Sequence, residues 1–163
     1  MKYKYGERRR ASEYEKALVD WWKKNKTFEK SIEQRDIDDS YVFYDGPPFI
    51  TGMPHHGTLL SSVVKDAVPR FWTMNGKRVE RRWGWDCHGL PTEVKVEETH
   101  GIKKNDVSRA KFREYCIDLT TKNIASMKKD MKAMGYSQDW TREFVTMNPE
   151  YMRRTQYSFW KMC

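Results

Sequence analysis

The spacing of apolar and polar residues along the chain predicts a series of helices interrupted by two short strands. A helix is expected to begin after Ser12, which forms a capping box with Glu15. Its inward side would carry Leu18, Val19 and Trp22. The polar segment 27–40 predicts a loop, and the apolar run that ends at Tyr44 predicts the first strand.

The longest amphipathic pattern follows Thr58. Its apolar residues recur at helical spacing and form a wide apolar face, made of Leu59, Leu60, Val63, Val64, Ala67, Val68, Phe71 and Trp72. Pro69 lies inside this pattern, so a kink or a late break of the helix is expected. The pair Asn75-Gly76 predicts the end of the helix, and a second short strand centred on Val79 follows over residues 77–83.

A strand, a helix and a strand of these lengths predict one right-handed crossover, which requires the two strands to be parallel. The fold class is therefore α/β. Ligands of such sheets bind beyond the carboxyl ends of the strands. One loop that begins at Asp45 and another that contains Asp86 both lie at that edge.

The rest of the chain is mainly helical. A helix is predicted from about Val107 to Met134, with Gly135 as its stop. Its expected inward positions are Phe112, Tyr115, Cys116, Leu119 and Ile124. A last helix begins near Asn148-Pro149 and continues to the final residue without a capping residue, which indicates a cut chain.

Length and composition predict one globular domain, with 163 residues of which 38% are hydrophobic. The three cysteines lack disulfide spacing, and no apolar run reaches the ~20 residues of a membrane span. We therefore expect a cytoplasmic protein without membrane contact. The net charge of +8 suits ATP or tRNA. For the helical lysines a solvated face is the favoured interpretation over a nucleic-acid stripe; the basic residues concerned are Lys103, Lys104, Lys111, Arg113, Lys122, Lys128, Lys129 and Lys132.

Two loops carry candidate chemistry. In Asp45-Gly46-Pro47-Pro48, proline fixes φ and glycine allows a ligand to approach the backbone. The segment Pro54-His55-His56-Gly57-Thr58 leads into a helix whose free N–H groups and dipole favour a phosphate. The alternatives are an ordinary turn for the first loop and solvated histidines for the second.

Asp86 is the third candidate, as an acidic partner for a cationic ligand group. The alternative is that it caps the following helix, in which Pro91 suits a first-turn position. Cys87, His88 and the histidine pair could in principle bind zinc, but no Cys-x-x-Cys spacing is present. Adjacent ligands on a strand also point to opposite faces, so no metal site is predicted.

At these residues the sequence resembles the class I aminoacyl-tRNA synthetases, and within them the isoleucine-specific enzymes. Three blocks carry the resemblance: 44–49, 54–58 and 84–93, the last reading Gly-Trp-Asp-Cys-His-Gly-Leu-Pro-Thr-Glu. A weaker likeness extends over 139–140 and 146–151. Thr58 stands where the family usually has a second histidine; it can donate one hydrogen bond but carries no positive charge.

The resemblance implies activation of isoleucine by ATP, with Mg²⁺, to isoleucyl-adenylate, followed by transfer to tRNA(Ile). The implied catalytic residues are His55 and Thr58. The implied ATP-binding residues are His55, His56, Gly57 and Thr58. The implied amino-acid-binding residues are Gly46, Pro47, Phe49, Asp86 and His88.

The resemblance also implies a domain organisation. Residues 1–40 would be an N-terminal helix and connector, and 41–163 the first half of a Rossmann-like catalytic domain, truncated before the editing insertion. The lysine loop, editing site and anticodon-binding domain of the family are absent, so the remainder of the synthetase is an expected partner. Two alternatives stay open: an inert nucleotide- or RNA-binding fragment, and a valine- or leucine-specific relative.

Overall fold

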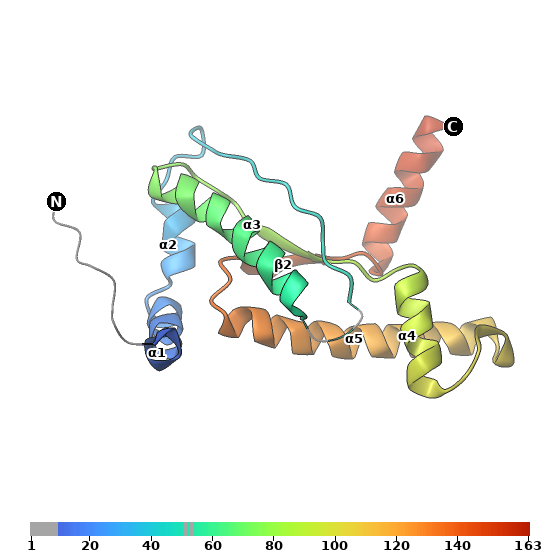
Figure 1. Ribbon diagram of the computed structural model, residues 1–163. Helices are drawn as coiled ribbons and strands as arrows, with labels where there is room; N and C mark the ends of the chain where they lie inside the picture. Colours follow the sequence, from blue (N-terminus) through green and yellow to red (C-terminus); the bar gives the residue numbers. More distant parts are fainter. Residues whose placement is uncertain (1–9, 51, 53) are drawn as a thin grey trace.

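The computed structural model describes residues 10–50, 52 and 54–163. The elements in chain order are α1 (Ala11–Lys24), α2 (Thr27–Glu33), α3 (His56–Met74), β1 (Arg82–Trp85), α4 (Leu90–His100), the 3-10 turn η1 (Lys104–Asp106), α5 (Arg109–Ala133), β2 (Asp139–Val145) and α6 (Pro149–Met162). Helix α5 runs along the molecule, with α1 and α2 near one end and α4 and α6 near the other (Figure 1).

The described residues form a sheet of two strands, β1 and β2, which are parallel. Arg82 pairs with Asp139, Gly84 with Phe144 and Trp85 with Val145, with an irregularity between Arg82 and Gly84. Helices α4 and α5 connect the two strands, as a parallel arrangement requires. The predicted α/β class is confirmed, although β2 was not predicted.

The first predicted strand does not form. Residues 41–48 are irregular and are joined to the neighbouring segment by two isolated parallel bridges, Ser40 to Arg78 and Phe49 to Asp86. The two prolines of this segment have no N–H to donate to a ladder, and Tyr44 is 91% exposed. The second strand was placed too early, because it spans Arg82–Trp85 instead of 77–83. The parallel direction of the two segments is as predicted.

Helix α3 forms where the periodicity places it, but with a different side toward the interior. Its buried residues are Ser62, Asp66, Pro69 and Thr73. The apolar residues Leu60, Val63, Val64, Phe71 and Met74 are between 55% and 78% exposed. The polar side is buried because it is hydrogen-bonded: Asp66 accepts from Arg70 at 2.6 Å and from the Ser137 N–H at 3.1 Å. Of the kink or late break expected at Pro69, the break does not occur, since the helix continues to Met74.

The N-terminal predictions need two corrections. Helix α1 begins at Ala11 with Arg10 as its N-cap and no side-chain cap, so the capping box of Ser12 and Glu15 is wrong. No residue of α1 is fully buried; Val19 and Trp22 are half-buried, and Leu18 is exposed. The predicted loop 27–40 contains α2, because Ile32 packs into the interior at 8% exposure.

A buried arginine connects several of these elements to the strand region. Arg81 is 4% exposed and donates to the hydroxyls of Ser137 at 2.8 Å, Ser31 at 3.0 Å and Thr73 at 3.4 Å. Its guanidinium also lies 5.0 Å from the centre of the Phe28 ring. Burial lowers the pKa of Arg81 to about 10, so the side chain stays charged at neutral pH. This one cation therefore holds α2, α3 and the turn before β2 together.

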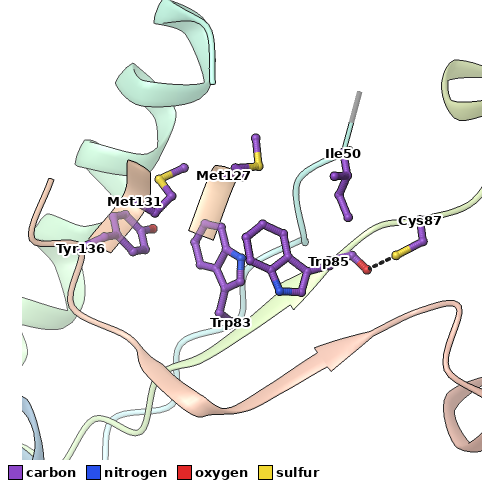
Figure 2. Packing of buried hydrophobic residues seen from close by; sticks show 7 residues of the cluster. All are labelled: Ile50, Trp83, Trp85, Cys87, Met127, Met131 and Tyr136. Atoms are coloured by element: carbon purple, nitrogen blue, oxygen red, sulfur yellow. Dashed lines mark hydrogen bonds between the residues drawn. The ribbon is translucent and has the colours of Figure 1, made fainter. Parts of the chain in front are cut away.

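The apolar core lies between α5 and the sheet. It contains Ile50, Trp83, Trp85, Cys87, Met127, Met131 and Tyr136 (Figure 2). Met127 and Met131 of α5 belong to the same buried cluster as the two indole rings of β1 (Figure 2). The ring of Trp83 meets that of Trp85 edge to face, with centroids 5.5 Å apart. The core thus fixes the end of β1, from which Asp86 follows.

The C-terminal elements agree with the sequence pattern. Ser108 caps α5 by accepting from the Lys111 N–H, Gly135 follows the helix with φ of +73°, and Asn148 precedes α6. The basic residues of the α5 region are exposed apart from the half-buried Lys128. None of the helices in the described part of the chain is long and apolar enough to cross a membrane.

Asp139 at the start of β2 is expected to make the fold sensitive to acid. Burial raises its pKa, but hydrogen bonds from Thr141 and Arg142 outweigh that effect and lower the pKa from 3.8 to about 2. Its contribution to the free energy of unfolding is therefore complete above about pH 4 and is lost as the pH falls toward 2, at a cost of about 2 kcal/mol. Urea unfolding measured between pH 6 and pH 2 checks this. Asp139→Asn should show a correspondingly smaller loss, and equal losses in both proteins would contradict the assignment.

Candidate active site

The loop 46–49 and Asp86 lie side by side, as the topology predicts. The Asp86 N–H donates to the carbonyl of Pro48 at 3.1 Å, and Phe49 forms a parallel bridge with Asp86. Asp86 is half-buried and directly follows β1, whose last residue Trp85 is fully buried. A rigid strand end therefore presents a carboxylate next to a glycine-proline loop.

A small cavity separates this loop from β1. It is lined by Phe43, Asp45, Gly46, Pro47, Pro48, Arg81, Arg82, Trp83, Gly84 and Gln138. Its volume of about 30 Å³ exceeds the ~10–15 Å³ that one water molecule needs. Of the predicted amino-acid-binding residues, Gly46 and Pro47 line this cavity. The cavity is too small to hold an amino acid. A substrate would have to lie outside this cavity, at the exposed edge of the loop.

The predicted phosphate-binding residues form one cluster at the first turn of α3. His55 is the N-cap residue, and its ring folds back over the turn: Nδ1 accepts from the Thr58 N–H at 3.3 Å, and Nε2 lies 3.2 Å from the Thr58 hydroxyl. A Cβ at Gly57 would lie 3.1 Å from that ring, so the absence of a side chain there lets the imidazole fold back. His56 is exposed beside them.

His88 is tied to the end of β2. Its Nε2 lies 3.1 Å from the Thr146 carbonyl, and the Thr146 hydroxyl accepts from the Cys87 N–H at 2.9 Å. Burial raises the pKa of the Cys87 thiol, which keeps it protonated at neutral pH. Thr146 therefore fixes the loop that follows Asp86. It was not predicted as a site residue, although it begins a stretch that carries the weaker family likeness.

The contacts of the described residues do not join the His55 cluster directly to Asp86. What links α3 to the first loop is an ion pair between Lys65 Nζ and Asp45 Oδ1 at 2.5 Å. On the other side, the Asn123 side chain of α5 donates to the Ile50 carbonyl at 3.2 Å. Neither Lys65 nor Asn123 was predicted. Within the described ranges, no group of three or more His, Cys, Asp or Glu side chains could hold a metal ion.

The described residues thus combine a parallel sheet, a helix capped by a histidine and an aspartate that follows a strand. The family model of class I tRNA synthetases (I, L, M and V) matches residues 17–163, and the chain belongs to that family.

Two curated relatives illustrate the similarity of this chain to the family. The valine–tRNA ligase of Methanothermobacter thermautotrophicus is 57% identical over 122 residues, which cover 75% of this chain and 14% of that protein. Isoleucine–tRNA ligase 2 of Pseudomonas fluorescens is 44% identical over 149 residues, covering 89% of this chain and 14% of that protein. The chain therefore spans about a seventh of the length of these relatives.

A comparison with solved structures concerns the fold of the chain. The leucyl-tRNA synthetase chain of an Agrobacterium radiobacter K84 LeuRS–tRNA–LeuAMS ternary complex matches with a TM-score of 0.72 and covers 93% of this chain and 17% of that one. The sequence identity of 21% makes this a similarity of fold alone. It supports the interpretation of the chain as part of a Rossmann-like α/β domain.

Proposed function

We propose that this chain forms part of the amino-acid activation site of an isoleucine- or valine-specific aminoacyl-tRNA synthetase. The observation that carries the proposal is the hydrogen bond from the Asp86 N–H to Pro48, which places a strand-end carboxylate beside the Gly46–Phe49 loop. Block 84–93 favours isoleucine, whereas the 57% identity to a valine enzyme favours valine. ATP and the cognate tRNA are the other proposed partners, and residues 41–163 are proposed as the first half of the catalytic domain.

The proposed reaction joins the amino acid to AMP. A carboxylate oxygen of the amino acid attacks the α-phosphorus of ATP, and the bond to the bridging oxygen breaks so that pyrophosphate leaves. Such in-line transfer depends on positioning and on stabilisation of charge. Transfer of the aminoacyl group to tRNA would then release AMP.

Each part of the site has a role in this proposal. Asp86 would accept hydrogen bonds from the α-ammonium of the amino acid, since a charge-assisted bond is about twice as strong as a neutral one. Gly46, Pro47, Phe49 and His88 would surround that amino acid. The α3 terminus would bind the phosphates, and for this the His55 ring must turn away from Thr58 and expose the first N–H groups. Mg²⁺ would arrive with the nucleotide, because such ions are held largely by substrate phosphates.

Asp86→Asn is expected to lower kcat/KM for the amino acid by about 30-fold, because losing a charged hydrogen-bond partner costs about 2 kcal/mol. Amino-acid-dependent ATP–pyrophosphate exchange, run with isoleucine and with valine on the polypeptide that carries these residues, measures the effect. Asp118→Asn is the matched control, since Asp118 is 55% exposed and pairs with Lys122 on the surface of α5. Equal exchange by wild type and Asp86→Asn would reject the role of Asp86.

A binding module without turnover is the second candidate, and the folded-back His55 ring favours it, because the phosphate-facing N–H of Thr58 is occupied. Calorimetric titration with ATP and with tRNA, together with single-turnover adenylate formation, separates the two functions. Binding without adenylate would support the module, whereas adenylate formation would exclude it.

A further inference from the structure

Two elements hold the carboxyl-terminal half of the glycine-proline loop. Its Pro48 carbonyl accepts from the Asp86 N–H, which follows β1. The next residues are anchored by Ile50, which is 1% exposed, belongs to the core and accepts a hydrogen bond from Asn123 of α5. One backbone hydrogen bond and the buried Ile50 that follows it therefore hold the carboxyl half of this loop.

The amino-terminal half of the loop is held differently. After the Tyr41 N–H, which donates to Arg78 at 2.9 Å, the chain is poorly packed: Val42 is 67% exposed and Tyr44 is 91% exposed. A Cβ at Gly46 would meet no heavy atom within 4 Å. Among the described residues, the Tyr41 ring stacks on Trp72 of α3 at the start of this stretch, and the ion pair of Asp45 with Lys65 joins its later part to the same helix.

We propose that Lys65 is a positioning residue of the activation site, which acts through Asp45 and does not touch the substrate. Lys65 extends from the middle of α3, the helix whose first turn carries the His55 cluster. The ion pair thus sets the distance between the helix that carries the phosphate-binding turn and the loop that faces the amino acid. This role rests on the proposed function, in which small displacements of the reacting groups carry a large cost in rate.

The first test is independent of any ligand. Lys65→Gln and Asp45→Asn should each let the loop open more often, so that the Asp86 amide, which is bonded to Pro48, exchanges its hydrogen about three to five times faster. Hydrogen exchange followed by NMR measures this. Because the two changes remove the same pair, the double variant should exchange no faster than either single one.

Lys122→Gln is the matched control, because Lys122 forms an exposed ion pair with Asp118 within α5. It should leave the exchange of the Asp86 amide unchanged. If the Asp86 amide exchanges at the wild-type rate in Lys65→Gln and Asp45→Asn, the ion pair does not hold the loop and the proposal is overturned.

The second test concerns the site. In ATP–pyrophosphate exchange, Lys65→Gln should raise KM for the amino acid about three to five times while KM for ATP and the midpoint of thermal unfolding stay at wild-type values. The charge-exchanged variant Asp45→Lys with Lys65→Asp should recover at least part of the affinity. A rise in both KM values, or no rise, would overturn the role. If wild type itself shows no amino-acid-dependent exchange, the proposed function fails, and the NMR experiment still decides whether Lys65 anchors the loop.

Discussion

Replacing Trp85 by alanine is expected to lower the free energy of unfolding by about 3–5 kcal/mol, the usual cost of removing a buried indole. Trp85 is 0% exposed and packs against Trp83 in the core above β1 (Figure 2). Because the total free energy of unfolding of a small domain is only about 5–15 kcal/mol, this variant should be close to unfolding at room temperature.

Urea unfolding followed by circular dichroism measures this loss. Trp160→Ala is the control of the same chemistry, since Trp160 is 83% exposed on α6, and it should change the stability by less than about 0.5 kcal/mol. Trp85→Phe should cost less than Trp85→Ala, because it keeps a ring and removes an indole N–H that has no hydrogen-bond acceptor. Similar effects of Trp85→Ala and Trp160→Ala would show that the core is not where the structure places it.

Gly84→Val is expected to destabilise the protein by about 3 kcal/mol through overpacking. A Cβ at Gly84 would lie 2.1 Å from the tip of the Phe144 ring, which lies across the strand pair. That ring is also stacked on Tyr151 of α6, with centroids 5.8 Å apart, so turning it aside would break this contact. The added side chain must therefore push the two strands apart.

Thermal and urea unfolding check the Gly84 result, with Gly46→Ala as the control because nothing surrounds a Cβ at Gly46. The double variant Gly84→Val with Phe144→Ala should regain part of the stability, since it removes the opposing ring. Wild-type stability of Gly84→Val would mean that Phe144 does not cover Gly84.

The sequence pattern correctly predicted helix ends that are marked by glycine, proline or asparagine. Asn75-Gly76, Gly135 and Asn148-Pro149 end or begin helices as expected, because their backbone preferences act within a few residues. The orientation of α3 could not be read in the same way. Asp66 is buried through a hydrogen bond to a residue 71 positions away, and no local pattern reports such a partner.

The strands were the weaker predictions, for a physical reason. In β2 the residues Thr141 and Arg142 are exposed and no strict alternation is present, so its pairing with β1 decides its conformation. For the candidate site, the predicted topology was sufficient to place the Gly46–Phe49 loop beside Asp86. It could not identify Lys65 or Thr146, which act through contacts between segments distant in sequence.

The pairing of β1 with β2 also determines when this region can assemble during synthesis. The loop after Asp86 is held by Thr146, which emerges from the ribosome only after the whole of α4 and α5. The two strands can pair only when their contacts offset the entropy cost of closing the long connection between them. The His55 turn of α3 can therefore take shape early in translation, whereas the loop after Asp86 waits for a strand made much later.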